Sequence, residues 1–263
     1  MKFKLLILVL FFFFLIKLSY SNELSIESSN IKIFENGNLI KAVDVEVDIP
    51  DKKLLIKSEN STLNKKQKFL TFSDNVKLYD SLNNIYVESK KLSYDENKNI
   101  IKSYGETLIQ IGQKYKINSS DLIYERNKLK IYSKKETTIS DNQNNIYNFD
   151  KKILIDLKNE IVTAENATMM DYENNSYKFQ NVKINLKNKN IAGKELEIGF
   201  VDNYFGNSKN DPVLKGRSAI SNDAETKIYK SSFTTCNTEN KTCPGWEIQA
   251  EEFTHDKISK TFN

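Results

Sequence analysis

Apolar and polar residues alternate in short runs from about residue 30 to about residue 205. In the run from Val43 to Ile49, for example, valine or isoleucine alternates with an acidic residue at every step. A period of two residues places side chains of one kind on one face of a β-strand, and the many β-branched residues favour that conformation. The pattern therefore predicts an all-β chain, with Val43 and Val45 on the same face of their strand.

Short polar clusters separate the apolar runs, at residues 95–99, 125–128, 158–160 and 187–190. They are rich in Asn, Lys and acidic residues, and Asn readily adopts the positive φ that tight turns need. Each cluster is therefore predicted to be a hairpin turn between two strands.

Similar units of two strands recur along the chain. Tyr86, Tyr115, Tyr147 and Tyr177 each open such a unit, at spacings of 29, 32 and 30 residues, and a weaker copy begins near Leu55. A period near 30 predicts units stacked edge to edge into one long twisted structure. Only 8 glycines are present, which argues against a tightly turned calcium-binding β-helix. We expect instead a folded-over antiparallel sheet, a jelly-roll-like sandwich open along one side, with an ordinary sandwich of similar strands as the alternative.

The interior of such a fold is lined by the inward side chains of every unit. The polar sets are expected to point outward (Lys90, Ser93 and Asp95; Lys183, Asn185 and Lys187), so the apolar sets must point inward. A closed interior would be a core, whereas splayed sheets would leave a continuous apolar trough suited to hydrocarbon chains. A register error of one residue would invert any strand. The candidates for acyl-chain contact are Leu92, Tyr94, Leu122, Tyr124, Ile153, Ile155, Val182, Ile184, Leu196 and Ile198.

The amino terminus carries an export signal. Lys2 and Lys4 precede 12 consecutive apolar residues, 5–16, and Ser19 and Ser21 then supply small residues for a signal peptidase. A membrane-spanning helix needs roughly 20 apolar residues, so residues 1–21 are predicted to be a signal peptide, with an uncleaved anchor as the alternative. Either way, the rest of the chain is expected outside the cytoplasm.

Charge and motif content exclude several functions. Without the three lysines of the signal peptide the formal charge falls from +4 to +1, which leaves no electrostatic footprint for nucleic acid. The sequence has one histidine, His255, and no Cys-x-x-Cys, phosphate-binding glycine loop or dinucleotide motif, so we expect no cofactor and no metal. Two carboxylates converging on a sheet face, as in polysaccharide-cleaving β-helices, are the strongest enzymatic alternative.

A series of short elements after Phe205 carries a resemblance. In order, these are Gly216-Arg217-Ser218, Phe233-Thr234-Thr235-Cys236, Trp246-Glu247-Ile248 and His255-Asp256. Together they resemble the junction between the periplasmic domain and the β-barrel in the family of LPS-assembly outer-membrane proteins, LptD, also called organic solvent tolerance proteins or OstA. The resemblance divides the chain into a signal peptide (1–21), an OstA-like periplasmic domain (22–205) and a junction segment (206–263).

The resemblance implies a twisted open β-jelly-roll whose apolar groove receives the acyl chains of lipid A, without catalysis. It implies stacking of an exposed edge strand on the soluble periplasmic bridge protein of the lipopolysaccharide exporter. It also places the chain in the periplasm or at the outer membrane of a Gram-negative bacterium. A lipoprotein plug would be a further partner where a barrel is present.

The sequence departs from the family pattern in two ways. It ends at Asn263 without a series of membrane-spanning strands, so we expect a partial version or a detached periplasmic module. Family members join the cysteine at the position of Cys236 to the barrel by a disulfide. Here a local Cys236–Cys243 bridge, two free thiols, or one cysteine reserved for an absent barrel stay open. The alternative functions are the soluble bridge component itself and a surface β-solenoid that binds protein.

Overall fold

The chain is all-β in the computed structural model, which describes residues 24–142, 145–170, 174–201, 212–235 and 246–263. None of the helices in this described part is both long and apolar enough to cross a membrane. Three single-turn 3-10 helices are present, η1 (Glu35–Gly37), η2 (Pro50–Lys52) and η3 (Arg126–Lys128). The strands are β1 (Ser25–Phe34), β2 (Leu39–Ile49), β3 (Leu54–Asn64), β4 (Phe69–Asp80), β5 (Ile85–Asp95), β6 (Ile100–Ile111), β7 (Tyr115–Ser120), β8 (Ile123–Glu125), β9 (Lys130–Ser133), β10 (Thr137–Asp141), β11 (Ile146–Phe149), β12 (Ile153–Asp156), β13 (Ile161–Met170), β14 (Ser176–Asn185), β15 (Ile191–Gly199), β16 (Val213–Ser221), β17 (Glu225–Thr234), β18 (Ile248–Asp256) and β19 (Thr261–Phe262).

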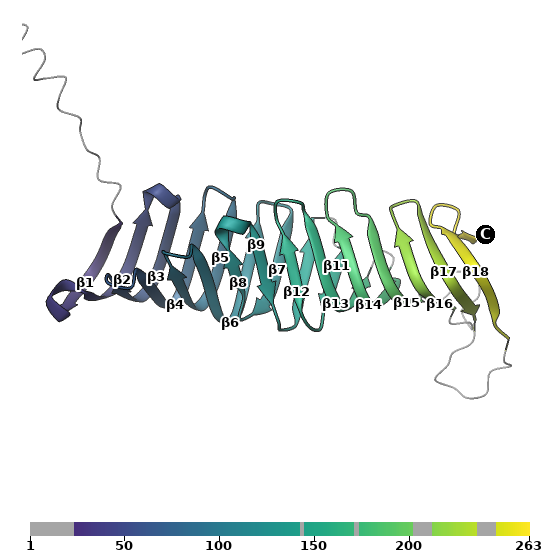
Figure 1. Ribbon diagram of the computed structural model, residues 1–263, viewed down its shortest axis with the longest axis horizontal. Helices are drawn as coiled ribbons and strands as arrows, with labels where there is room; N and C mark the ends of the chain where they lie inside the picture. The colour runs from purple at the N-terminus through teal and green to yellow at the C-terminus, as the bar shows by residue number, and fades with distance from the viewer. Residues whose placement is uncertain (1–23, 143–144, 171–173, 202–211, 236–245) are drawn as a thin grey trace, which may run out of the picture.

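Strands that follow each other in the chain pair antiparallel, so one long meander runs from β1 to β19 (Figure 1). In the middle of the meander, three strands are each divided into two halves: β7 and β8, β9 and β10, and β11 and β12. The pairing shows this division, because β6 pairs along its length with both β7 and β8, and β13 pairs with both β11 and β12. The repeat of two strands per 30 residues is confirmed: Tyr86, Tyr115, Tyr147 and Tyr177 are each the first or second residue of a strand.

Each long strand bends near its middle. The ladder is interrupted there, as where Lys57 pairs with Lys77 and the next pair is Asn60 with Ser73, which leaves two residues of β3 and three of β4 between the pairs. Residues with positive φ mark the bend in alternate strands, among them Asp44, Asn166, Glu195 and Lys230. A skipped pair accentuates the local twist and re-aims the following side chains. The bends align along the molecule and fold the sheet into two facing arms. The first arm contains the start of β4 with the turn at 65–68, and the second arm contains the end of β4 with the turn at 81–84.

The bends correct one expectation from the alternation. Val43 was expected on the same face as Val45, but Val43 is 44% exposed and Val45 is buried. Asp44, with φ of 51°, lies between them and changes the face that the strand presents. The inward positions of β2 are therefore Ile40 and Ala42 before the bend, and Val45, Val47 and Ile49 after it.

A single apolar cluster fills the space between the arms along the length of the sheet. In β4, for example, Leu70 and Phe72 come from the first arm and Val76 and Leu78 from the second. Fully burying one such side chain stabilises the fold by about 1.5–3 kcal/mol. The many inward side chains therefore hold the arms together.

Buried and half-buried hydroxyl groups lie where the strands bend. The Thr107 hydroxyl donates to Ser103 Oγ at 2.7 Å and lies 3.2 Å from Ser89 Oγ, while Ser119 and Thr137 hydroxyls lie 2.7 Å apart. Small hydroxyl side chains can satisfy polar groups that the interrupted ladder leaves without a strand partner.

Ser93 was expected on the outside and is buried, with 1% of its surface exposed. Its hydroxyl lies 3.2 Å from the Tyr104 hydroxyl, in the neighbouring strand β6. Alternation along β5 could not indicate this contact, because it involves the neighbouring strand.

Candidate functional site

All ten side chains named as candidates for acyl contact lie in the interior, each with at most 4% of its surface exposed. Eight belong to the first arm, on β5, β8, β12 and β14 or, for Leu122, just before β8. Leu196 and Ile198 belong to the second arm, on β15. The alternation therefore identified inward residues correctly, and any ligand between the arms must displace packed side chains. Their contact with lipid stays a prediction.

The facing residues of the second arm were missed. They include Leu78, Val87, Ile109, Ile117 and Phe149, all 2% exposed or less. Their strands also alternate, but alternation alone does not show the bend that turns the two halves of a strand toward each other. Alternation within a half-strand finds them once the bends are known.

The turns form two rows, one at the tip of each arm. The first-arm row includes the turns at 65–68, 96–99, 126–129, 157–160 and 186–190, and the second-arm row includes those at 50–53, 81–84 and 112–114. Backbone bonds link successive turns within a row, such as Leu157 N to Leu129 O at 2.8 Å and Gly112 N to Asn84 O at 2.9 Å. We call the line along which the two rows face each other the mouth.

A buried ion pair forms the first bridge across the mouth. Arg126, in η3 of the first arm, donates from Nε to Asp80 Oδ2 at 2.9 Å and from Nη2 to Asp80 Oδ1 at 3.0 Å. The side chains are 3% and 0% exposed. The Tyr124 hydroxyl donates to Asp80 Oδ2 at 3.0 Å, and Arg126 Nη2 also donates to the Lys52 carbonyl at 2.8 Å. Residues that are distant in the sequence and lie on opposite arms are therefore joined by a satisfied polar network.

Electrostatics keep both groups of this pair charged. Burial would raise the pKa of Asp80, but hydrogen bonds from Arg126 and Asn83 outweigh it and hold that pKa below its usual value. Burial would lower the pKa of Arg126, and the hydrogen bond to Asp80 raises it instead. Burial and the Asp80 charge raise the pKa of the Tyr124 hydroxyl. Around neutral pH the Asp80 carboxylate and the Arg126 guanidinium are therefore both charged, and the Tyr124 hydroxyl keeps its proton.

Two further bridges cross the mouth toward the carboxyl-terminal end. In the second bridge the Tyr115 hydroxyl, at the start of β7, donates to the Leu186 carbonyl at 3.0 Å. In the third, Lys257 Nζ lies 5.9 Å from the centre of the Tyr177 ring and donates to the Asn222 carbonyl at 2.6 Å. Both are weaker than a buried ion pair.

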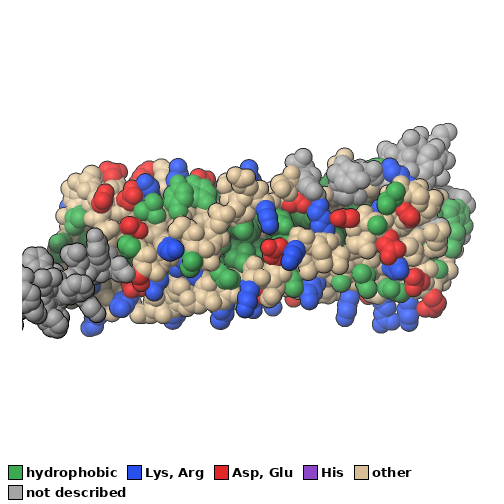
Figure 2. Space-filling model, turned by 90° about the horizontal axis from the view of Figure 1, so that it is seen from above, with side chains coloured by type: hydrophobic (Ala, Val, Ile, Leu, Met, Phe, Trp, Pro, Cys, Tyr) green, Lys and Arg blue, Asp and Glu red, His purple; other side chains and the backbone are tan. Residues whose placement is uncertain are grey.

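Half-buried apolar side chains lie along the mouth between the first and second bridges. Ile111, Tyr115, Leu157 and Leu186 pack against the core with one side open, and Leu129 is also half-buried. Figure 2 views the molecule from above, and a recess lined by hydrophobic side chains is visible near the middle of its length. A cavity of about 480 Å³ adjoins the first bridge, lined by Tyr79, Asp80, Ser81, Asn84, Ile85, Tyr86, Gln110 and Gly112.

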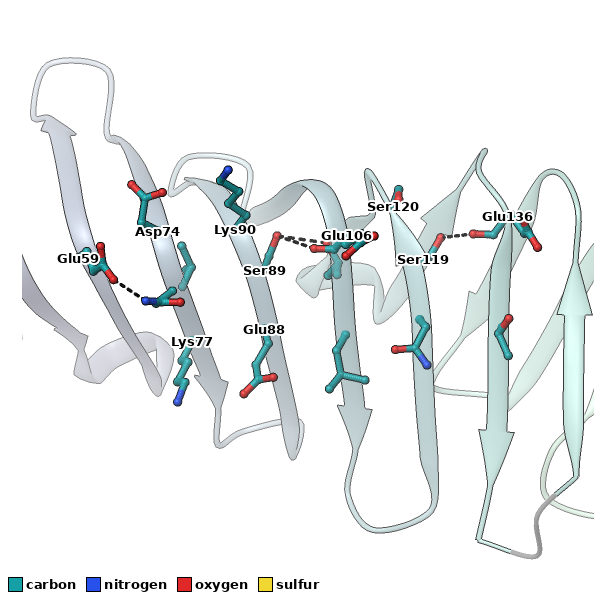
Figure 3. Close-up of a pocket in the computed structure, with 16 residues that line it drawn as sticks. Glu59, Asp74, Lys77, Glu88, Ser89, Lys90, Glu106, Ser119, Ser120 and Glu136 are labelled. Atoms are coloured by element: carbon teal, nitrogen blue, oxygen red, sulfur yellow. Dashed lines mark hydrogen bonds between the residues drawn. The ribbon is translucent and has the colours of Figure 1, made fainter.

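A polar groove of about 1020 Å³ lies on the outside, over the bends of β3 to β10 (Figure 3). Its carboxylates come from Glu59, Asp74, Glu88, Glu106 and Glu136, interspersed with Lys77, Lys90 and hydroxyl groups. Asn75 donates to Glu59 within the groove. Glu59, Glu106 and Glu136 are exposed, so water solvates their charge. The groove is a hydrated sheet surface.

The strands of the junction segment continue the same sheet, since β16 pairs with β15 and β17 with both β16 and β18. His255 is buried at the end of β18, with its ring 5.4 Å from that of Phe200. Cys236, Cys243 and the signal peptide (1–21) lie outside the described residues. The division at residue 205 remains a prediction.

No family model matches the chain, and no curated protein matches its sequence. A solved structure similar to part of the chain is LptH of Pseudomonas aeruginosa, described as the LptA-homologous periplasmic component of a conserved lipopolysaccharide transport device. The identity is 10%, the alignment covers 55% of this chain and 83% of LptH, and the TM-score is 0.25. We therefore infer function from the chain's own residues and geometry.

Proposed function

We propose that this chain is an exported, non-catalytic carrier in lipopolysaccharide transport and assembly, whose interior receives the acyl chains of lipid A. One observation carries the proposal: a continuous apolar interior runs between two arms, whose tips are linked across the mouth by the three bridges described above. Each buried methylene group gains about 0.8 kcal/mol, so hydrocarbon chains favour such an interior strongly over water. The packed side chains separate to admit them.

The export signal and the junction elements support a place in the periplasm, at the outer membrane of a Gram-negative bacterium. Two positions in the transport apparatus fit: the periplasmic part of an LptD-type protein, with a lipoprotein plug where a barrel follows, and the soluble bridge component. The edge strand β1 favours stacking on a further bridge protein in either position. It exposes Ile31, Ile33 and Phe34, an apolar strip beside an edge that can accept another strand.

A binding role fits the chemistry of the carboxylates better than catalysis does. A glycosidase needs an acid whose pKa is raised by a dry environment, close to a second carboxylate. Glu59, Glu106 and Glu136 in the outer groove are exposed to water. The buried carboxylate Asp80 is instead held charged by Arg126, so it is unsuited to donate a proton.

Photo-reactive side chains at inward and outward neighbours test the proposal. Leu122 and Ile184 face the interior, whereas Ile123 is half-buried and Lys183 is exposed on the outside. Incubation with purified lipopolysaccharide should give adducts at the two inward positions and little at the outward ones. Equal labelling at all four, or none in variants with native-like melting, would refute the carrier. A protein-binding β-solenoid would give no lipid adduct anywhere.

A further inference from the structure

Two tyrosines lie side by side on the outer face of the second arm. Tyr79 on β4 and Tyr86 on β5 are cross-strand partners, and their ring centroids lie 4.8 Å apart with the ring planes tilted by 40°. Tyr79 is 39% exposed, so part of its ring faces solvent. The Tyr86 hydroxyl donates to Glu88, which fixes the orientation of the second ring. The pair therefore presents a held aromatic surface on the side of the sheet away from the interior.

The cavity of about 480 Å³ lies against these two rings, and we call it the tyrosine cleft. Neighbouring turns of the second-arm row form another part of its wall, with Ser81, Asn84 and Gly112. Backbone bonds hold these turns together, from Gly112 N to Asn84 O at 2.9 Å and from Ser81 N to Lys53 O at 3.1 Å. Small-molecule sites typically enclose about 300–1,000 Å³. The cleft is therefore preformed and large enough for a small ligand.

The cleft offers neutral polar groups beside the rings. Among the described residues that line it, only Asp80 is charged, and its carboxylate is buried and paired with Arg126. The side-chain amides of Asn84 and Gln110 make no hydrogen bond to the described part of the chain. A Cβ at Gly112 would lie 3.1 Å from Asn84 Nδ2, so the glycine leaves room for that amide. A primary amide both donates and accepts hydrogen bonds, so the walls suit an uncharged ligand that does the same.

We propose that the tyrosine cleft binds an uncharged saccharide. A pyranose has an apolar C–H face that packs on an aromatic ring, and hydroxyl or acetamido groups at its edge that bond to amides. One sugar ring stacks on Tyr79, and the amides of Asn84 and Gln110 bond to its polar edge. The cleft lies outside the arms, so this binding needs no separation of the arms and is independent of the carrier function. A glycan held there tethers the chain to a polysaccharide while the interior stays available.

Binding can be tested with two uncharged tetrasaccharides, chitotetraose and cellotetraose, which share a β-1,4 linkage and differ in the acetamido group. Nuclear magnetic resonance spectra of the full chain resolve the side-chain NH2 groups of asparagine and glutamine. The resonances of Asn84 and Gln110 should shift as at least one of the two sugars is added. No shift of either resonance with either sugar would overturn the proposal.

Substitutions in the cleft separate a binding role from a structural one, because the readout is sugar affinity in variants with native-like melting. Tyr79→Ala and Gln110→Ala should each weaken binding about two- to tenfold. Tyr104→Ala is the matched control, since Tyr104 is 42% exposed on the neighbouring strand β6 but does not line the cleft. Its affinity should equal that of the native chain. Unchanged binding in both cleft variants, or an equal loss in the control, would overturn the site.

Lipopolysaccharide carries sugars of its own, and competition tells the two sources of saccharide apart. Saturation with purified lipopolysaccharide should leave the affinity for the bound tetrasaccharide unchanged, because the cleft lies outside the arms. Loss of tetrasaccharide binding would overturn a separate glycan and assign the cleft to the sugars of the lipid. The carrier function is judged separately, by photo-labelling at Leu122 and Ile184, so either proposal can fail without the other.

Discussion

Arg126 and Asp80 lie 46 positions apart in the chain, and their side chains form a bidentate ion pair that is shielded from water between the two arms. The pair lies at the mouth, where the apolar interior would otherwise reach solvent. Its partners Tyr124, Asn99 and the Lys52 carbonyl satisfy the remaining polar atoms. Because the network spans both arms, it fixes how far they stand apart at this point.

Removal of one member of this pair should destabilise the protein strongly. Arg126→Met leaves the Asp80 carboxylate buried without its cation, which costs about 3–5 kcal/mol of unfolding free energy. Chemical denaturation followed by circular dichroism measures the loss. Lys57→Met, which breaks the exposed pair with Glu46, is the control and should leave the unfolding free energy nearly unchanged, because water screens an exposed ion pair. Similar losses in both variants would contradict the structural role of the first bridge.

The same pair should make stability depend on acid. The folded-state pKa of Asp80 lies below its unfolded value of about 3.9, so the pair contributes fully above that pH and its contribution is lost as the pH falls through the folded pKa. The unfolding free energy of the native chain should therefore fall more steeply below about pH 4 than that of Asp80→Asn. Parallel pH profiles for the two proteins would show that Asp80 is not stabilised as a carboxylate.

A glycine in β15 faces a packed aromatic ring. A Cβ added at Gly193 would lie 2.1 Å from Phe179 Cδ1, so the ring must move to admit it. Gly193→Ala should lower the unfolding free energy by about 1–3 kcal/mol through overpacking. Phe179→Leu in the same chain should recover part of the loss, since the smaller side chain leaves room. Ala192→Ser, on the exposed neighbour, is the control, and a larger loss there would contradict the packing at Gly193.

The apolar strip on β1 should mediate edge-to-edge association. Ile33 is 65% exposed and Phe34 is 43% exposed. Lysines at these two positions should abolish concentration-dependent association with a further copy or with a bridge protein, measured by analytical ultracentrifugation, because charge opposes strand addition at an edge. Leu82→Lys, at an exposed turn residue, should leave association unchanged. Association that survives the β1 substitutions would place the contact elsewhere.

The sequence predicted the local structure well because alternation within a half-strand is a local signal. Val182 and Ile184 in β14 illustrate it, since both were placed inward and both are buried. The bends could not be predicted, because residues such as Glu195 and Lys230 adopt positive φ without a glycine to mark it. The first bridge was missed for a different reason. Asp80 and Arg126 look like ordinary turn residues until the folded-over sheet brings their strands together.

The central claim is that acyl chains lie between the arms, which must separate to admit them. Nitroxide labels at Lys114 and Lys158 report this separation by pulsed electron spin resonance in a chain with Cys236 and Cys243 replaced by serine. These lysines lie away from the first bridge, on turns of the two arms that approach each other near Tyr115. Saturation with purified lipopolysaccharide should shift the distance distribution to longer values, and a lipid-free sample should keep the short distance. Stoichiometric lipopolysaccharide binding with an unchanged distribution would contradict the account.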